Sequence, residues 1–287
     1  MARGTPDVVL TLKRSFMKIG FSTIGCPGWD FSEIFSAATD LKYSGIEFRG
    51  VGEEIFMPKV KAFMPENIKT TKAKFKNAGL YVPIFTSGAV LSDKAGIKDT
   101  MSEAKEYVKL AAAFGTKYIR VLADRNPAPD KLIDEKFLIE NLKEICAFAE
   151  TLKIKVLIET NGYYAVSESA VCLIKKTEAK NLFLIWDAHH TFRYGGESAE
   201  KSFRTLGKYI KHVHIKDSKI IDGKLCYKFP GEGDVPIAAV IKLLTDAGFK
   251  GCLCLEWVKR WEAELAEPGI ILPAFKFFAD NIIAGEK

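Results

Sequence analysis

The amino-acid sequence predicts an α/β protein built as a single (β/α)₈ TIM barrel, and three observations lead to this prediction. Short apolar runs rich in Ile, Val and Phe alternate with longer segments of helical periodicity, a pattern typical of βαβ units around a parallel sheet. About eight such pairs can be counted along the chain. No composition break or Gly/Ser/Pro-rich linker divides the 287 residues, and about 250 residues is the usual length of one barrel.

Each element has its own signal. The expected strands are residues 18–24, 45–49, 81–86, 118–123, 154–160, 182–187, 212–216 and 252–257. The expected helices are residues 31–43, 65–78, 97–114, 133–152, 167–176, 198–206, 235–247 and 268–283. Asp30 precedes the first helix, Gly79, Gly115 and Gly248 follow three others, and Pro268 opens the last, as helix boundaries require. An open doubly wound sheet is the structural alternative, but no G-x-G-x-x-G motif or P-loop follows the first strand.

The first residues have a different character from the rest. Residues 1–16 are expected to form a loosely held, flexible extension, followed by one barrel domain over residues 17–287. Residues 8–10 are shorter than the apolar core of a secretory signal, and no stretch approaches the ~18 apolar residues of a membrane span. Six cysteines without a C-x-x-C pair indicate a reduced protein. We therefore expect a cytoplasmic protein that has no membrane partner.

The charge distribution argues against a nucleic-acid partner. Forty-two Lys and Arg against thirty-six Asp and Glu give a formal net charge of +6. This excess is spread along the chain, and no run of Lys and Arg resembles the basic patches that bind nucleic acids. We expect a small molecule to be the partner.

Four ionisable side chains follow apolar runs at the ends of four successive strands: Glu159, Asp187, His214 and Glu256. Functional groups of a barrel stand at the carboxyl ends of its strands, so these four would converge around one axis. Burial of any one of these side chains without a partner would cost folding free energy. Rim salt bridges would explain any one of them. Three carboxylates and one imidazole together suit one divalent cation, such as Mn²⁺, Mg²⁺, Co²⁺ or Zn²⁺.

The segments around these residues resemble the xylose isomerase-like superfamily of sugar phosphate isomerases and epimerases. The resemblance covers most of the chain from about Lys18 onward, and its motifs are ETNGYY, WDAHH, HVHIKD, PGEGDVP and LEW, with FSTIGCPGWD and GIEFRG in the first half. The superfamily includes tagatose epimerase, hydroxypyruvate isomerase, inosose dehydratase and endonuclease IV.

The resemblance implies a role for each of the four residues. Glu159, Asp187, His214 and Glu256 correspond to the metal ligands, and Glu159 and Glu256 also to the catalytic acid/base pair. In such an enzyme a metal ion binds the carbonyl and adjacent hydroxyl oxygens of a sugar or sugar phosphate and stabilises an enediolate. One glutamate removes the proton and the other returns it from the opposite face. His190 corresponds to a histidine that contacts a substrate oxygen.

Further residues are candidates for substrate binding. Lys216 shares strand parity with His214, so we expect it to neutralise a carboxylate or phosphate of the substrate, a rim salt bridge being the alternative. The epimerases carry an arginine in this region, where this chain reads KDSK over residues 216–219, which leaves the substrate undefined. Glu47 and Arg49 alternate at the end of the second strand and are expected to face the barrel mouth, or else to pair with each other.

Three weaker features complete the candidates. Trp261 is expected to cover an apolar sugar face, and Arg193 is a further anion-binding residue. Gly231 and Gly233 of PGEGDVP predict a close backbone approach, more typical of a helix-entry turn than of a phosphate loop.

The leading hypothesis is therefore a metal-dependent sugar isomerase or epimerase. An inosose dehydratase-like lyase is the first alternative, because it would use the same proton abstraction. An endonuclease IV-like enzyme is disfavoured, because a trinuclear zinc site needs more than the four histidines present, all beyond residue 188. A non-catalytic sugar-binding barrel is disfavoured by the paired glutamates. Association into a homo-oligomer stays open.

Overall fold

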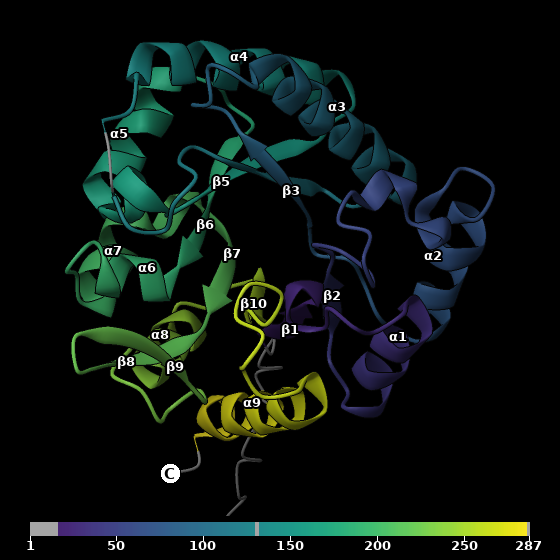
Figure 1. The fold of residues 1–287 in the computed structure, drawn as a ribbon, viewed down its shortest axis with the longest axis vertical. Helices are drawn as coiled ribbons and strands as arrows, with labels where there is room; N and C mark the ends of the chain where they lie inside the picture. The colour runs from purple at the N-terminus through teal and green to yellow at the C-terminus, as the bar shows by residue number, and fades with distance from the viewer. Residues whose placement is uncertain (1–16, 130–131, 286–287) are drawn as a thin grey trace, which may run out of the picture.

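Eight parallel strands curl into a ring in the computed structural model, which describes residues 17–129 and 132–285 (Figure 1). The strands lie in the order β2-β1-β10-β7-β6-β5-β4-β3. Isolated parallel bridges between Gly45 and Tyr81 and between Phe48 and Phe85 join the two edges. The predicted barrel is confirmed. Its strands are β1 (Lys18–Ser22), β2 (Gly45–Glu47), β3 (Phe85–Val90), β4 (Tyr118–Leu122), β5 (Lys155–Glu159), β6 (Leu182–Asp187), β7 (Ile210–Ile215) and β10 (Cys252–Leu255).

Helices surround this ring on the outside (Figure 1). Capping residues start several of them: the Asp30 side chain accepts from the backbone N–H of Ser32 and Glu33 at the first helix. None of the helices within the described ranges has the length and apolar character needed to cross a membrane. The helices are α1 (Phe31–Asp40), α2 (Ile68–Asn77), α3 (Ile97–Phe114), α4 (Glu135–Thr151), α5 (Ser167–Thr177), α6 (Ala188–Arg193), α7 (Ala199–Leu206), α8 (Ile237–Asp246) and α9 (Pro268–Ala284).

The strands present alternate side chains to two different environments. On β5, Val156 and Ile158 pack into the large apolar core, whereas Leu157 belongs to a small cluster with Ile84 and Ile185. Successive side chains of a strand point to opposite faces. The large core therefore fills the space between strands and helices, and the small cluster fills part of the barrel interior. Residues with the parity of Leu157 point into the barrel.

The structure differs from the sequence prediction in three elements. β3 begins at Phe85, four residues later than expected, because Pro83 has no N–H to donate to a neighbouring strand. An antiparallel hairpin, β8 (Asp217–Ile221) and β9 (Lys224–Lys228), follows β7 and was not predicted. The helix α6 was also missed. The extension predicted over residues 1–16 lies outside the described residues.

Candidate active site

Strand parity brings the four predicted ligands into the barrel interior. Glu159 shares the parity of Leu157 on β5, and Asp187 that of Ile185 on β6. His214 on β7 pairs in register with both Asp187 and Cys254. Glu256 directly follows β10, and its backbone N–H donates to the carbonyl of Ile215 at 2.9 Å. All four side chains therefore project from neighbouring strands at the carboxyl end of the ring.

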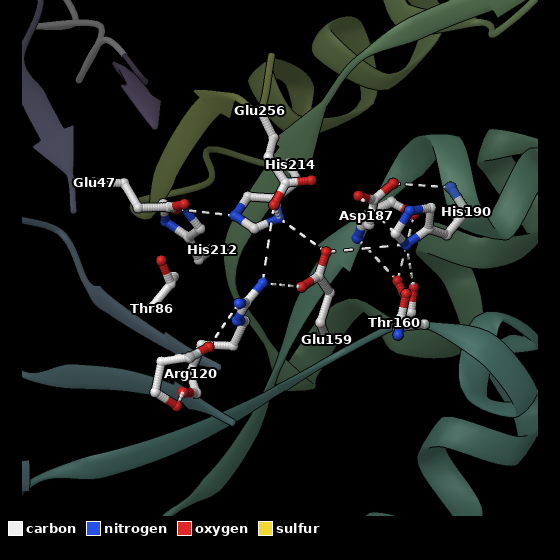
Figure 2. A network of polar contacts seen from close by, with 12 residues as sticks. Glu47, Thr86, Arg120, Glu159, Thr160, Asp187, His190, His212, His214 and Glu256 are labelled. Atoms are coloured by element: carbon white, nitrogen blue, oxygen red, sulfur yellow. Dashed lines mark hydrogen bonds and ion pairs between the residues drawn. The ribbon is translucent and has the colours of Figure 1, made fainter. Parts of the chain in front are cut away.

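The four side chains meet closely. Each provides one ligand atom, and these atoms all lie within 4.8 Å of one another. All four residues are buried. His214 Nδ1 lies 3.1 Å from Glu159 Oε1 and 3.4 Å from Glu256 Oε1 (Figure 2). Metal–oxygen and metal–nitrogen bonds of about 2.1 Å place opposite donor atoms about 4.2 Å apart, so this donor set fits one divalent cation.

Two cations hold the outer oxygens of these carboxylates. Arg120 Nη1 donates to Glu159 Oε2 at 2.7 Å, and Lys216 Nζ donates to Glu256 Oε2 at 2.6 Å and also to Asp187 Oδ2. Each glutamate thus turns its remaining oxygen, Oε1, towards His214. Ion pairs replace some of the hydration that burial removes. Each of the three carboxylates therefore has a positive partner within the chain, with Asp187 and Glu256 sharing Lys216.

Electrostatics keep Glu159 ionised. Burial would raise its pKa, but the positive charges of His214 and Arg120 outweigh this effect and hold the pKa of Glu159 well below its usual range. The pKa of Lys216 moves the other way: burial would lower it, but Asp187, Glu256 and Glu159 raise it well above its ordinary value. The site therefore contains an ionised carboxylate and a protonated ammonium group.

Glu47 lies behind His214. Its Oε2 accepts from His214 Nε2 at 2.9 Å and from His212 Nε2 at 2.7 Å (Figure 2). The side chain is fully buried and lines no part of the site cavity. The expectation that Glu47 faces the barrel mouth is therefore corrected, because His212 and His214 hold its carboxylate inside the barrel, away from the cavity. An N–H fixed on Nε2 leaves Nδ1 as the ligand atom.

His190 lies beside Asp187. Asp187 caps the helix α6, and its Oδ1 accepts the backbone N–H of His190 at 2.8 Å. The ring atom Nδ1 lies 3.1 Å from the carbonyl oxygen of Thr160 and 3.5 Å from Asp187 Oδ2. Burial, helped by the charge of Lys216, lowers the pKa of His190 to about 3. This imidazole is neutral at physiological pH.

A cavity of about 460 Å³ opens at this end of the barrel. A cavity of this size accommodates a small organic ligand. Its lining includes six residues of the predicted site: Arg49, Glu159, His190, Lys216, Glu256 and Trp261. A larger cavity of about 760 Å³ lies at the opposite end, lined by residues such as Lys18 and Tyr118, which begin their strands. Two members of the cluster, Glu159 and Glu256, line the smaller cavity.

Arg193 and the glycine loop have internal partners. Arg193 donates to the Oγ and backbone carbonyl of Ser218 and pairs with Asp234 at 3.1 Å, so the structure places it against the hairpin rather than in the cavity. Gly231 and Gly233 donate their backbone N–H to Asp217 Oδ2, both at 2.9 Å. The loop therefore binds a carboxylate of the chain itself, and the expected close backbone approach is confirmed.

Sequence reasoning missed Arg120 and Tyr227. Arg120 interrupts the apolar strand β4 and has the same inward parity as Glu159, so the rule that found the carboxylates also applies to it. Tyr227 comes from the hairpin and lines the cavity. Burial raises its pKa to about 12. No local signal connects residue 227 with the site, because the hairpin folds over it through tertiary packing.

Comparison with known proteins gives matches over most of the chain. The sequence profile of the family described as xylose isomerase-like TIM barrel matches residues 35–280. Fructoselysine 3-epimerase of Escherichia coli O157:H7 is 26% identical over 262 residues, covering 86% of this chain and 93% of that protein. Inosose dehydratase of Clostridium botulinum (strain Alaska E43 / Type E3) is 21% identical over 276 residues, covering 84% of this chain and 89% of that protein. The crystal structure of the IOLI protein with a binding zinc atom has a TM-score of 0.75 at 19% identity, and the match covers 94% of this chain and 99% of the other.

Proposed function

This chain belongs to the xylose isomerase-like TIM barrel family, and we propose that it is a divalent-metal-dependent epimerase or isomerase of a sugar or sugar derivative. The observation that carries the proposal is the pair of buried glutamates that face one histidine. Glu159 Oε1 and Glu256 Oε1 lie 3.1 and 3.4 Å from His214 Nδ1, and they come from strands on either side of β7 and β6 in the ring. A proton can therefore be removed on one side of a bound sugar and returned on the other.

The proposed metal ligands are Glu159, Asp187, His214 and Glu256. Bound there, Mn²⁺, Mg²⁺, Co²⁺ or Zn²⁺ would act as a Lewis acid that polarises a substrate carbonyl and lowers the pKa of the adjacent C–H. Oxygen and imidazole donors suit these ions. The IOLI protein has this fold, and its crystal structure is described as having a bound zinc atom, which supports a metal ion at the proposed site.

The proton transfers are assigned to side chains of this protein. Glu159 acts as the base, because Arg120 and His214 keep it ionised inside the barrel. Glu256 delivers the proton from the other side. Its Oε2, held by Lys216 at 2.6 Å, is the oxygen that would carry this proton when Oε1 binds the metal. Arg120 and Lys216 also lie where negative charge develops on the substrate, and fixed cations at such a place lower the barrier.

Neutral His190 is proposed to accept a hydrogen bond from a substrate hydroxyl group. It lines the cavity next to Lys216, and its low pKa keeps it uncharged. In the neutral ring Nδ1–H donates to the Thr160 carbonyl at 3.1 Å, so Nε2 is left as an acceptor for a substrate hydroxyl. Trp261 is proposed to cover an apolar face of the sugar from the cavity rim.

A dehydratase is the second candidate, and the full-length match to inosose dehydratase favours it. Elimination needs an acid that protonates the departing hydroxyl group. Lys216 is the buried proton carrier nearest Glu256, but the raised pKa that its carboxylate partners produce makes it a weak acid. This electrostatic setting favours proton return to carbon over loss of water.

Incubation of the metal-loaded enzyme with ketoses in D₂O tests the proposal. The expected result is one solvent deuteron at the epimerised carbon without loss of water. Glu159→Gln and Glu256→Gln are each expected to lower kcat by at least 10²-fold, which is the usual contribution of a positioned acid or base. Glu103→Gln, which changes a carboxylate outside the ligand cluster, serves as the matched control. Turnover of an inosose with loss of water would identify the dehydratase instead. Full activity of both glutamine variants would refute proton transfer by these residues.

A further inference from the structure

Four cationic side chains line the site cavity, and three of them are already neutralised. Arg120 pairs with Glu159 at 2.7 Å, Lys216 with Glu256 at 2.6 Å, and Arg125 with Asp93 at 2.7 Å. The fourth is Arg49. Among residues 17–129 and 132–285, no carboxylate oxygen lies within 4.0 Å of its guanidinium. Its positive charge is therefore open to the cavity.

Two acids near Arg49, Glu47 in the sequence and Glu103 in the fold, have other partners. Glu47, its expected partner, accepts from His212 and His214. Glu103 Oε1 accepts the backbone N–H of Gly88 at 2.6 Å. Burial and the like charge of Arg120 lower the pKa of Arg49, and Tyr107, Glu103 and Glu256 offset this only in part. A guanidinium stays protonated under such a shift.

Backbone geometry holds Arg49 in place where no ion pair does. Its backbone N–H donates to Thr23 Oγ1 at 2.9 Å. The register of β3 against β4 shifts between Thr86 and Val90, and the guanidinium lies against Gly88 in this irregular segment. A Cβ on residue 88 would come within 3.1 Å of Arg49 Nη2. Arg49 is therefore a positioned donor that lacks an acceptor.

The position of Arg49 in the ring sets the direction of a ligand. In the strand order, β2 and β6 are four strands apart, so they face each other across an eight-stranded ring. Arg49 follows β2, and Asp187 ends β6. Arg49 lines the same cavity of about 460 Å³ as Glu159 and Glu256 of the cluster, whereas Asp187 is not part of its lining. A ligand whose reacting carbon lies at the carboxylate cluster would direct its far end towards Arg49.

We propose that Arg49 binds an anionic group, a carboxylate or a phosphate, at the end of the substrate remote from the reacting carbon. This inference rests on the proposed function, since it names the substrate class of the same site. The planar guanidinium offers a fork of N–H donors that matches the two oxygens of either anion. Lys216, which the sequence suggested for this role, is unsuitable because two carboxylates already surround it.

The test compares three ketoses that share one reacting end: fructose, fructose 6-phosphate and fructuronate, which carries a carboxylate at carbon 6. Wild type, Arg49→Gln, Arg49→Lys and Arg125→Gln are each loaded with Mn²⁺. The kcat/KM for deuterium incorporation and the Kd by calorimetry are then measured for every pair. Arg125→Gln is the matched control, because it removes a cation of the same cavity whose charge Asp93 already neutralises.

We expect wild type to prefer one anionic ketose over fructose by 10- to 100-fold, the size of a charge-assisted hydrogen-bonded pair. Arg49→Gln should remove this preference while values for fructose stay within twofold, and Arg49→Lys should restore part of it. Arg125→Gln should retain it. The anion that shows the preference identifies the group as phosphate or carboxylate.

The two proposals fail in different ways. Anion-selective binding that depends on Arg49, without turnover of any ketose, would support this inference and refute the proposed function. Two results would overturn the inference and leave the proposed function intact. One is a kcat/KM for fructose equal to that for both anionic ketoses. The other is an equal loss of kcat/KM for charged and neutral ketoses in Arg49→Gln. Absence of saturable binding of all three compounds would also overturn the inference.

Discussion

Replacement of Glu47 by glutamine should weaken metal binding although Glu47 is not a proposed ligand. The carboxylate accepts from two buried imidazoles, at 2.7 Å from His212 and 2.9 Å from His214. A glutamine side chain of the same size has only one acceptor oxygen, and its amide nitrogen is a donor. The amide oxygen can take the place of Oε2 and accept from both rings, but it carries no negative charge, so both hydrogen bonds weaken and His214 Nε2 holds its proton less firmly. If His214 carries its proton on Nδ1, the atom that faces Glu159 and Glu256 can no longer bind a metal ion.

The size of the effect follows from the role of such hydrogen bonds. Loss of the partner that orients a ligating histidine typically costs 10- to 100-fold in metal affinity, or about 1.4–2.7 kcal/mol. Competition between the protein and a fluorescent chelator for Zn²⁺ measures this change directly. Nitrogen-15 NMR of the histidine rings reports which nitrogen of His214 carries the proton.

His212→Gln provides the matched control. His212 contacts the same oxygen of Glu47 but is not one of the four proposed ligands. Its replacement should change the Zn²⁺ affinity by less than about threefold, since the His214 contact with Glu47 is retained. An affinity of Glu47→Gln within threefold of wild type, in a protein that unfolds at the normal temperature, would refute the reasoning. Equal losses in both variants would attribute the effect to packing instead.

Three further predictions concern stability. Lys216→Met leaves two buried carboxylates without their cation, so the free energy of unfolding in EDTA should fall by about 3–5 kcal/mol, and Mn²⁺ should raise the Tm more than in wild type; an equal Mn²⁺ effect would contradict this. His190 has a pKa of about 3 in the fold and 6.5 when unfolded, so the unfolded state binds the proton more readily and the free energy of unfolding should fall as pH drops below about 6.5. In urea titrations with EDTA, His190→Asn should reduce this pH dependence by up to about 1.4 kcal/mol per pH unit. An unchanged pH dependence would show that other groups cause it. Gly233→Ala would place a Cβ against Asp217 Oδ1 and should lower stability by at least about 2 kcal/mol in thermal unfolding, whereas Gly269→Ala, which meets nothing within 4 Å, should not; equal Tm values would refute the close approach.

The sequence allowed the barrel and the cluster of four to be predicted because both depend on strand parity. A period of two places Glu159, Asp187 and His214 on the same side as the inner apolar residues, and parallel strands end at the same edge. The four candidate ligands could therefore be predicted without knowledge of long-range packing.

Other features depend on distance in three dimensions. Glu47 contacts His212 and His214, which lie 165 and 167 residues away in the sequence, rather than Arg49. A choice of partner over such separations has no local signal. The hairpin β8–β9 did have a local signal, since Asp222 and Gly223 both adopt positive φ at its turn, and an Asp-Gly pair favours such turns. The strands are short and partly exposed, so their weak alternation concealed the element.

The internal cations Arg120 and Lys216 have a consequence for how the protein would acquire the proposed metal ion. Many small metal-binding domains unfold without their ion, because nothing else compensates the ligands. Here each ligand carboxylate already has a positive partner supplied by the chain. Newly synthesised protein can therefore fold without the metal ion and remain folded in the metal-free form. Uptake of the ion would then take place in a folded protein, with Oε1 of both glutamates already directed towards His214.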